Sequence, residues 1–118
     1  MAMPLRGTIL MPRTLKPRCL LVEDVEAMRT LLSVLLEGIE CEVVAAESLL
    51  AARQILRSKE QDSFDFIILD LELPDGNGLE LLPEVDELVR VVALTADDSR
   101  EAQLQCRHAG CEAVLSKS

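Results

Sequence analysis

Polar side chains that can bind ions follow four short aliphatic segments of the sequence. The carboxylates, the hydroxyl and the ammonium concerned belong to Glu23, Asp24, Asp70, Thr95 and Lys117. Carboxylates that are brought together raise one another's proton affinity, and a divalent cation with oxygen ligands relieves that cost. Magnesium suits such a set because it accepts one or two carboxylates together with a phosphoryl oxygen. If the fold gathers these residues, they form a site for magnesium and phosphate.

Each of these residues has an ordinary structural role when it is considered alone. A single aspartate after a strand usually caps a helix or forms a turn, because its side chain accepts hydrogen bonds from nearby backbone groups. Thr95 alone fits a strand, and Lys117 alone fits a solvated position. The functional interpretation therefore depends on their joint placement after the aliphatic segments.

The aliphatic segments predict a parallel sheet. Apolar runs without polar alternation are typical of strands that are covered on both faces. The five predicted strands span residues 19–22, 43–46, 64–69, 89–94 and 113–115. Helical periods lie between them, at residues 26–37, 48–57, 77–82 and 99–109.

The ends of these helices also have sequence signals. Ser48 and Ser99 are capping residues at two helix starts, whereas Gly38 and Gly110 are expected to end two helices. Pro83 is expected to cut the short third helix. Right-handed crossovers wind such a chain into a doubly wound sheet, whose ligand site lies at the carboxyl ends of the strands. The polar residues named above lie at those ends.

Composition and charge restrict the class of protein. A chain of 118 residues with 49% apolar residues has room for one domain, and its core must be aliphatic because aromatic residues make up only 2%. The net charge of −9 disfavours binding to nucleic acid or to anionic membranes. A loose basic cluster near the start is interpreted as a solvated arm, with contact to an acidic partner as the alternative: Arg6, Arg13, Lys16 and Arg18.

The four cysteines are predicted to be reduced and mostly buried, in a cytoplasmic protein. Cys19, Cys41, Cys106 and Cys111 have no C-x-x-C spacing. A zinc site that combines Cys106, His108 and Cys111 with a distant fourth ligand is the alternative. No apolar stretch reaches the length of a membrane span.

Four segments together resemble the receiver domain of bacterial response regulators. They are Leu20-Leu21-Val22-Glu23-Asp24, then Ile68-Leu69-Asp70-Leu71-Glu72-Leu73-Pro74-Asp75-Gly76-Asn77-Gly78, and Ala93-Leu94-Thr95-Ala96 with Leu115-Ser116-Lys117. The resemblance covers residues 18–118, after an arm or linker of residues 1–17. It implies a flavodoxin-like, doubly wound α/β fold with a five-stranded parallel sheet in the order 2-1-3-4-5. It also implies magnesium held by Glu23, Asp24, Asp70 and the backbone carbonyl of Glu72.

The resemblance further implies a phosphorylation switch of two-component signalling. Asp70 would accept a phosphoryl group from a histidine kinase, a phosphotransfer protein or a small phosphodonor, and the chain would catalyse only its own phosphorylation and dephosphorylation. Lys117 would neutralise the phosphoryl oxygens, which the Thr95 hydroxyl and the Ala96 amide would bind. Glu72 and Asp97 would flank the water that hydrolyses the phosphate. The output partner has no sequence signal.

The chain departs from the family pattern in three ways. Val114 replaces the usual aromatic residue, and Ser118 replaces the proline that normally follows the lysine, which predicts a less well placed Lys117. The sequence ends at Ser118, so the last helix of the family is missing. We expect one of three explanations: a piece of a longer chain, a gap filled by residues 5–15, or a second subunit in a homodimer.

Two other functions fit parts of the sequence. A receiver fold that binds partners without phosphoryl transfer is favoured by Val114 and Ser118, but it leaves the complete acidic and lysine set unexplained. A phosphatase or transferase of the haloacid dehalogenase type also has an aspartate after a strand. Such an enzyme needs a second aspartate where Glu72 stands, and a cap insertion for which this chain has no room.

Overall fold

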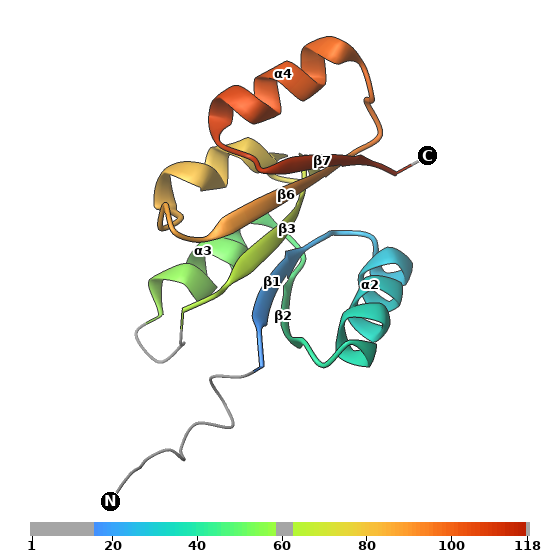
Figure 1. Cartoon of the computed structure of the whole chain (residues 1–118), viewed down its shortest axis with the longest axis vertical. Coiled ribbons are helices and arrows are strands. Elements are labelled where there is room, and N and C mark those ends of the chain that lie inside the picture. Colours follow the sequence, from blue (N-terminus) through green and yellow to red (C-terminus); the bar gives the residue numbers. More distant parts are fainter. Residues whose placement is uncertain (1–15, 59–62, 118) are drawn as a thin grey trace, which may run out of the picture.

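A computed structural model describes residues 16–58 and 63–117 of the chain. Five strands form one parallel sheet in the order β2-β1-β3-β6-β7 (Figure 1). These strands are β1 Arg18–Val22, β2 Glu42–Ala46, β3 Phe66–Asp70, β6 Arg90–Thr95 and β7 Ala113–Ser116. In chain order they are the first to the fifth of the predicted strands, so the predicted order 2-1-3-4-5 and the flavodoxin-like fold are confirmed.

Helices cover the two faces of the sheet unequally. Figure 1 shows α2 on one side of the sheet and α3 on the other. The helices are α2 Glu26–Gly38, α3 Leu49–Arg57, the 3₁₀ helix η2 Gly78–Glu84 and α4 Arg100–Ala109. A small antiparallel pair, β4 Glu72–Leu73 and β5 Gly76–Asn77, lies between β3 and η2. Sequence analysis did not predict this pair.

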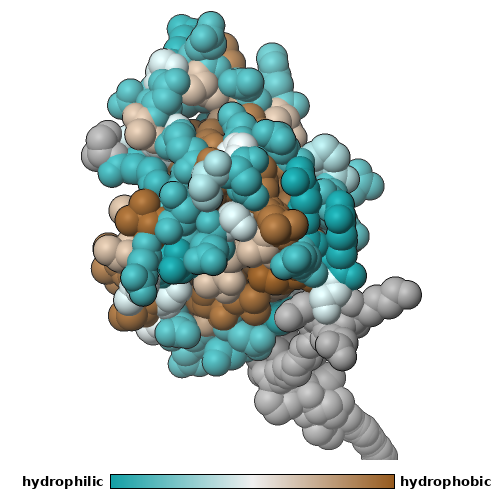
Figure 2. Space-filling view, turned by 180° about the vertical axis from the view of Figure 1, so that it is seen from behind, coloured by the Kyte–Doolittle hydropathy of each residue, from teal (hydrophilic) through white to brown (hydrophobic). Residues whose placement is uncertain are grey.

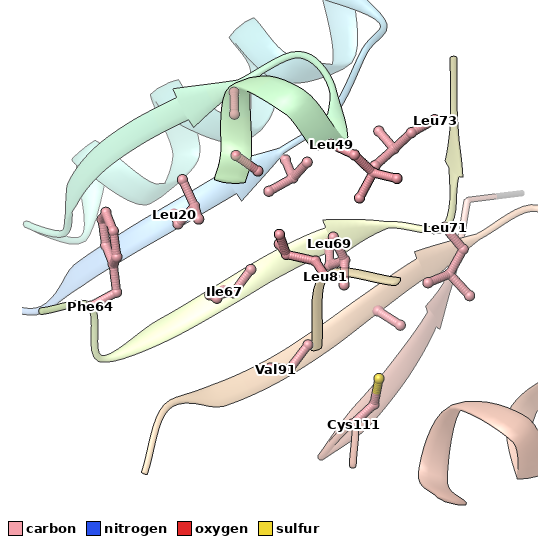
Figure 3. Close-up of a cluster of buried hydrophobic side chains, with 14 of the residues drawn as sticks. Leu20, Leu49, Phe64, Ile67, Leu69, Leu71, Leu73, Leu81, Val91 and Cys111 are labelled. Atoms are coloured by element: carbon pink, nitrogen blue, oxygen red, sulfur yellow. The ribbon is translucent and has the colours of Figure 1, made fainter. Parts of the chain in front are cut away.

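The main core lies between the sheet and the helices α3, η2 and α4. Alternate residues of β1 and β3 point into it, among them Leu20 and Ile67, and both are fully buried. Leu49 of α3 and Leu81 of η2 meet them from the helical layer (Figure 3). Only two aromatic residues occur in the chain, so this core is almost entirely aliphatic. Packing in this core fixes where each strand ends relative to its neighbours, and therefore the positions of the residues that follow the strands.

The opposite face of the sheet is covered less completely. Helix α2 has no fully buried residue, and Leu31, Val34 and Leu35 on it are 53%, 59% and 57% exposed. Leu115 of β7 is 52% exposed. Figure 2 shows apolar side chains at the surface on the flank where α2 lies. Among the described residues these side chains of α2 and β7 are therefore exposed, and residues 5–15, which we considered as their cover, lie outside the described residues.

Helix α2 ends at Gly38, as expected, and Glu40 two residues later has a positive φ of 63°. The predicted end of the short third helix at residue 82 was wrong by two residues, because η2 continues to Glu84. Pro83 lies inside the last turn of η2 and does not end it. The 3₁₀ helix tolerates this proline because a proline removes only one backbone donor near a helix end.

The caps of α3 and α4 are as predicted. The Ser48 hydroxyl accepts a hydrogen bond from the Ala51 amide at 3.0 Å, and the Ser99 hydroxyl accepts one from the Ala102 amide at 3.2 Å. Gly110 ends α4 with φ 108°. Both helices therefore begin, and α4 also ends, where local chemistry favours it.

Arg18 does not belong to a solvated arm, which corrects the prediction for the basic cluster. Its side chain is buried, donates a hydrogen bond from Nε to Glu42 at 2.9 Å, and lies 4.8 Å from the ring centre of Phe64. A guanidinium with both a carboxylate and an aromatic partner tolerates burial at the first residue of β1. Arg6 and Arg13 lie outside the described residues.

The cysteine prediction is confirmed as far as burial and pairing are concerned. All four cysteines are free and buried. Burial raises the pKa of the Cys19 thiol to about 12, so this thiol is protonated and unreactive. In the described part of the chain, no helix has the length and apolar character that crossing a membrane would require.

Candidate functional site

The backbone hydrogen bonds of the sheet continue beyond the strand ends and position the residues there. The Glu23 amide donates to the Ala46 carbonyl at 3.0 Å, and the Lys117 amide donates to the Thr95 carbonyl at 2.9 Å. The Leu71 amide, next to Asp70, donates to the Leu94 carbonyl at 2.9 Å. The polar residues therefore stand on a fixed backbone at one edge of the sheet.

Three carboxylates meet at this edge. Glu23, Asp24 and Asp70 each offer an oxygen, and these oxygens lie within 4.8 Å of one another. Glu23 and Asp70 are fully buried. In the described part of the chain this is the one group of His, Cys, Asp or Glu side chains close enough to share a metal ion. The zinc alternative with Cys106, His108 and Cys111 therefore has no support there.

Arg29 of α2 holds the backbone that carries the acidic pair. One nitrogen of its guanidinium, Nη1, donates to the Glu23 carbonyl at 2.9 Å and to the Asp24 carbonyl at 3.2 Å. The carboxylates themselves remain available for other partners. Sequence reasoning missed this role, because an arginine on an amphipathic helix has no signal that distinguishes it from a solvated one.

Lys117 is the positive charge in the site. Its ammonium donates a hydrogen bond to Asp70 Oδ2 at 3.0 Å and forms an ion pair with Glu23 Oε1 at 3.1 Å. Lys117 therefore reaches both carboxylates, from a backbone that the pairing of β7 with β6 positions. Ser118 lies outside the described residues, so its expected effect on the placement of Lys117 stays a prediction.

The environment of Asp70 shifts its protonation. Burial raises the pKa of Asp70 to about 6, against the opposing effects of hydrogen bonds from the Glu72 amide and from Lys117. Burial also disfavours the charged form of Lys117, but its contacts with Asp70 and Glu23 prevail and raise its pKa. Lys117 is therefore a cation at neutral pH.

The acidic cluster has an unsatisfied acceptor. Glu23 Oε2 accepts a hydrogen bond from the Val25 amide at 3.0 Å, whereas Glu23 Oε1 is buried and accepts none. Its contact with the Lys117 ammonium, at 3.1 Å, is an ion pair. Two buried carboxylates, a third beside them and one ammonium leave an excess of negative charge. A buried oxygen without a hydrogen-bond donor and this charge excess both fit a divalent cation with oxygen ligands.

Thr95 and Ala96 carry hydrogen-bond donors at the end of β6, and a carboxylate binds both of them. The Thr95 hydroxyl donates to Glu72 Oε2 at 2.8 Å, and the Ala96 amide donates to Glu72 Oε1 at 3.1 Å. The Asp97 amide donates to the Thr95 hydroxyl oxygen at 3.0 Å. Sequence reasoning placed these donors correctly at the sheet edge, but it did not foresee that the Glu72 side chain would reach them.

The comparisons with known proteins agree with this geometry. The family model of the response regulator receiver domain matches residues 19–118. The chain belongs to this family. Among curated relatives, it is 37% identical over 100 residues to the KDP operon transcriptional regulatory protein KdpE of Escherichia coli, covering 83% of this chain and 43% of that protein. It is 34% identical to the sensory/regulatory protein RpfC of Xanthomonas campestris, covering 85% of this chain but only 14% of that protein.

Solved structures support the same family. The non-phosphorylated HemR receiver domain of Leptospira biflexa matches with a TM-score of 0.77 and 32% identity, over 86% of this chain and 82% of that one. A response regulator of Burkholderia pseudomallei matches with a TM-score of 0.78 and 26% identity, over 86% and 60% of the two chains. That structure contains a phosphorylated aspartic acid and a calcium ion. TrrA of Thermotoga maritima, in complex with Mg²⁺ and BeF, matches with a TM-score of 0.72 and 27% identity, over 86% and 87%.

Proposed function

We propose that this receiver domain is a magnesium-dependent phosphorylation switch, with Asp70 as the residue that accepts the phosphoryl group. The observation that carries the proposal is the contact of Lys117 with Asp70 beside the Glu23–Asp24 pair. Asp70 is a buried carboxylate with one ammonium and two further carboxylates beside it. Charged groups that are fixed in this way can stabilise the negative charge of a phosphoryl group during its transfer. The phosphorylated aspartic acid of the Burkholderia relative supports the same chemistry.

The reaction transfers a phosphoryl group from the phosphohistidine of a kinase or phosphotransfer protein. An oxygen of the Asp70 carboxylate attacks phosphorus, the phosphorus–nitrogen bond breaks, and the electron pair of that bond stays on the leaving imidazole. Hydrolysis of the resulting acyl phosphate by water returns Asp70 and inorganic phosphate. The chain acts on no separate substrate, so we propose a switch rather than an enzyme.

The residues of the site contribute mainly by position and charge, as phosphoryl transfer requires. Glu23, Asp24 and Asp70, with the backbone carbonyl of Glu72, would hold magnesium, which supplies charge neutralisation for the phosphoryl oxygens. Lys117 keeps its charge at neutral pH and offers N–H donors to the same oxygens. The Thr95 hydroxyl and the Ala96 amide bind the remaining oxygens.

The chain covers only part of the length of the first relatives, so partner and output belong to this proposal as well. We propose a histidine kinase or a phosphotransfer protein as the donor, and a cytoplasmic location. The four free, buried thiols support a reducing compartment. The alternative function, in which the domain binds its partner without phosphorylation, rests only on Val114 and Ser118 in place of the usual aromatic residue and proline, and the family match does not favour it.

Intact mass spectrometry distinguishes the two functions. The protein is incubated with acetyl phosphate and magnesium, and its mass is compared with that of the Asp70→Asn variant and of a sample with EDTA. We expect the addition of one phosphoryl group in the wild type with magnesium and none in either control. A folded wild type that stays unmodified under all conditions would contradict the switch and favour the binding module.

A further inference from the structure

The Glu72 carboxylate binds the two donors that the proposed function assigns to the phosphoryl group. Its two oxygens accept one hydrogen bond each, from the Thr95 hydroxyl and from the Ala96 amide. We infer that Glu72 is an internal competitor of the phosphoryl group, which holds the loop after β6 in the unphosphorylated arrangement and slows phosphorylation. This inference rests on the proposed function.

Glu72 and a phosphoryl oxygen cannot both bind the Thr95 hydroxyl and the Ala96 amide, because these two donors have too few hydrogen atoms. A hydroxyl and a backbone amide each donate a single hydrogen. The Thr95 oxygen already accepts from the Asp97 amide at 3.0 Å, so this hydroxyl has its donor and one acceptor position in use. A phosphoryl oxygen can bind these donors only after Glu72 has released them.

Charge adds to the competition. The Glu72 carboxylate and the phosphoryl group are both anions, and like charges within a few ångström repel each other. Glu72 cannot stay beside the donors as a second acceptor once the phosphoryl group has arrived. Phosphorylation therefore requires that the Glu72 side chain leave, and the loop that carries Ala96 and Asp97 is then free to move with its new ligand.

The release of Glu72 requires little rearrangement. Its backbone is fixed, because the Glu72 amide donates to Asp70 Oδ1 at 2.9 Å and β4 pairs with β5. Its side chain is exposed, so it can turn into water without uncovering the core. The contact is therefore a brake on phosphorylation and not a block, and its removal should tighten the binding of a phosphoryl analogue.

The test measures the binding of beryllium fluoride in the presence of magnesium. The chain contains no Trp or Tyr, so we choose fluorine NMR rather than intrinsic fluorescence. The wild type is compared with Glu72→Ala, which removes both acceptors, and with Glu72→Gln, which keeps the length of the side chain. Asp98→Asn, in the same loop, removes one negative charge without touching the contact.

We expect Glu72→Ala to bind the analogue about 10-fold more tightly than the wild type, because the donors are free from the start. This change corresponds to about 1.4 kcal/mol. Glu72→Gln should fall between the two, and Asp98→Asn should differ from the wild type by less than about 2-fold. In the ligand-free protein, the amide proton of Ala96 should shift in Glu72→Ala and stay in place in Asp98→Asn.

The outcomes separate this inference from the function on which it rests. Equal affinity in the wild type and in Glu72→Ala would overturn the competition while leaving the switch intact. An equal gain in Asp98→Asn would also overturn it, because the effect would then be one of net charge. Absence of binding in every folded variant would overturn the proposed function and the inference together.

Discussion

Glu23 and Asp70 are fully buried and share one ammonium group, that of Lys117. Removal of two carboxylates from water is costly unless their charge is compensated, and one lysine compensates only part of it. The Glu23 Oε1 oxygen, which shares this ammonium but accepts no hydrogen bond, marks where compensation is incomplete. In the proposed function, this residual charge would attract a cation and would link the stability of the domain to the bound metal.

Magnesium should therefore stabilise the folded domain. A ligand that binds only the folded state adds about 1.4 kcal/mol when its concentration is ten times its dissociation constant. We expect the melting temperature to rise with magnesium, and the Asp24→Asn variant to need about 10-fold more magnesium for the same rise, a shift of about 1.4 kcal/mol. Differential scanning fluorimetry measures both titrations. If Asp24→Asn and the wild type respond at the same concentration, Asp24 is not a ligand.

Two glycines near and far from the site differ in the space available for a side chain. A Cβ atom at Gly78 would collide with the backbone carbonyl oxygen of Asp70. A Cβ atom at Gly38 would have no other atom within 4 Å. We expect Gly78→Ala to lower the free energy of unfolding by about 1–3 kcal/mol through overpacking, and to reduce phosphorylation. Gly38→Ala should instead be neutral or stabilising by up to about 1 kcal/mol. Urea denaturation measures both, and similar effects would contradict this assignment.

At the scale of single residues, the sequence indicated which side chains would meet but not how far they would reach. Asp70, Thr95 and Lys117 could be predicted because parallel strands end at one edge of a sheet. The contact of Glu72 with Thr95 spans 23 positions and depends on side-chain rotamers, which leave no pattern in the sequence. The same holds for the hydrogen bonds of Arg29 to the acidic loop.

Helix α3 begins with caps from two different elements. Besides Ser48, the carboxylate of Asp75 accepts hydrogen bonds from the Leu49 and Leu50 amides, both at 2.9 Å. Asp75 lies in the turn between β4 and β5, directly beyond the segment that carries Glu72. Hydrogen bonds therefore hold the start of α3 against the loop after β3.

The Asp75 contact should make the melting temperature depend on pH. Hydrogen bonds from the backbone amides of Leu49 and Leu50 lower the pKa of Asp75 from its usual value of 3.8. A lowered pKa means that the stabilisation is fully present above pH 3.8 and is lost as the pH falls through the lower, folded-state value. We expect Asp75→Ala to melt below the wild type at neutral pH, with the difference shrinking in acid. A difference that persists unchanged at low pH would show that the charge of Asp75 is not involved.

At the scale of elements, segments with an apolar pattern could be predicted, including the short helix at residues 77–82, whereas strands of two residues could not. The five strands and the helices α2, α3 and α4 have hydrophobic patterns of sufficient length. The pair β4 and β5 consists of strands of two residues each, too short for any periodicity. The start of η2 did have a signal that we missed, because Asn77 and Glu80 have the spacing of a capping box and form one.

The whole molecule has one well-covered and one partly covered face. On the covered face Leu81 is fully buried, whereas Leu31 and Leu35 on α2 are more than half exposed. We expect Leu81→Ala to cost about 2–5 kcal/mol and Leu35→Gln to change stability by less than about 0.5 kcal/mol. Urea denaturation tests this contrast. A large loss in Leu35→Gln would show that this face is covered, by residues 5–15 or by a second copy, and sedimentation would tell these apart.

The architecture as a whole was the most predictable property of the chain. Five apolar strands alternating with helices leave few topologies once crossovers must be right-handed, and the resemblance to receiver domains selected the order that the sheet adopts. No comparable topological rule predicts what covers the flank of α2. That question depends on segments or partners outside the described residues.

The central claim is that Asp70 itself carries the phosphoryl group. Reduction of the phosphorylated domain with borohydride converts an aspartyl phosphate into homoserine, and peptide mass spectrometry then locates the modified residue. We predict homoserine at position 70, only after incubation with magnesium and a phosphodonor. Homoserine at another aspartate, or a phosphoryl group that borohydride does not remove, would contradict the account.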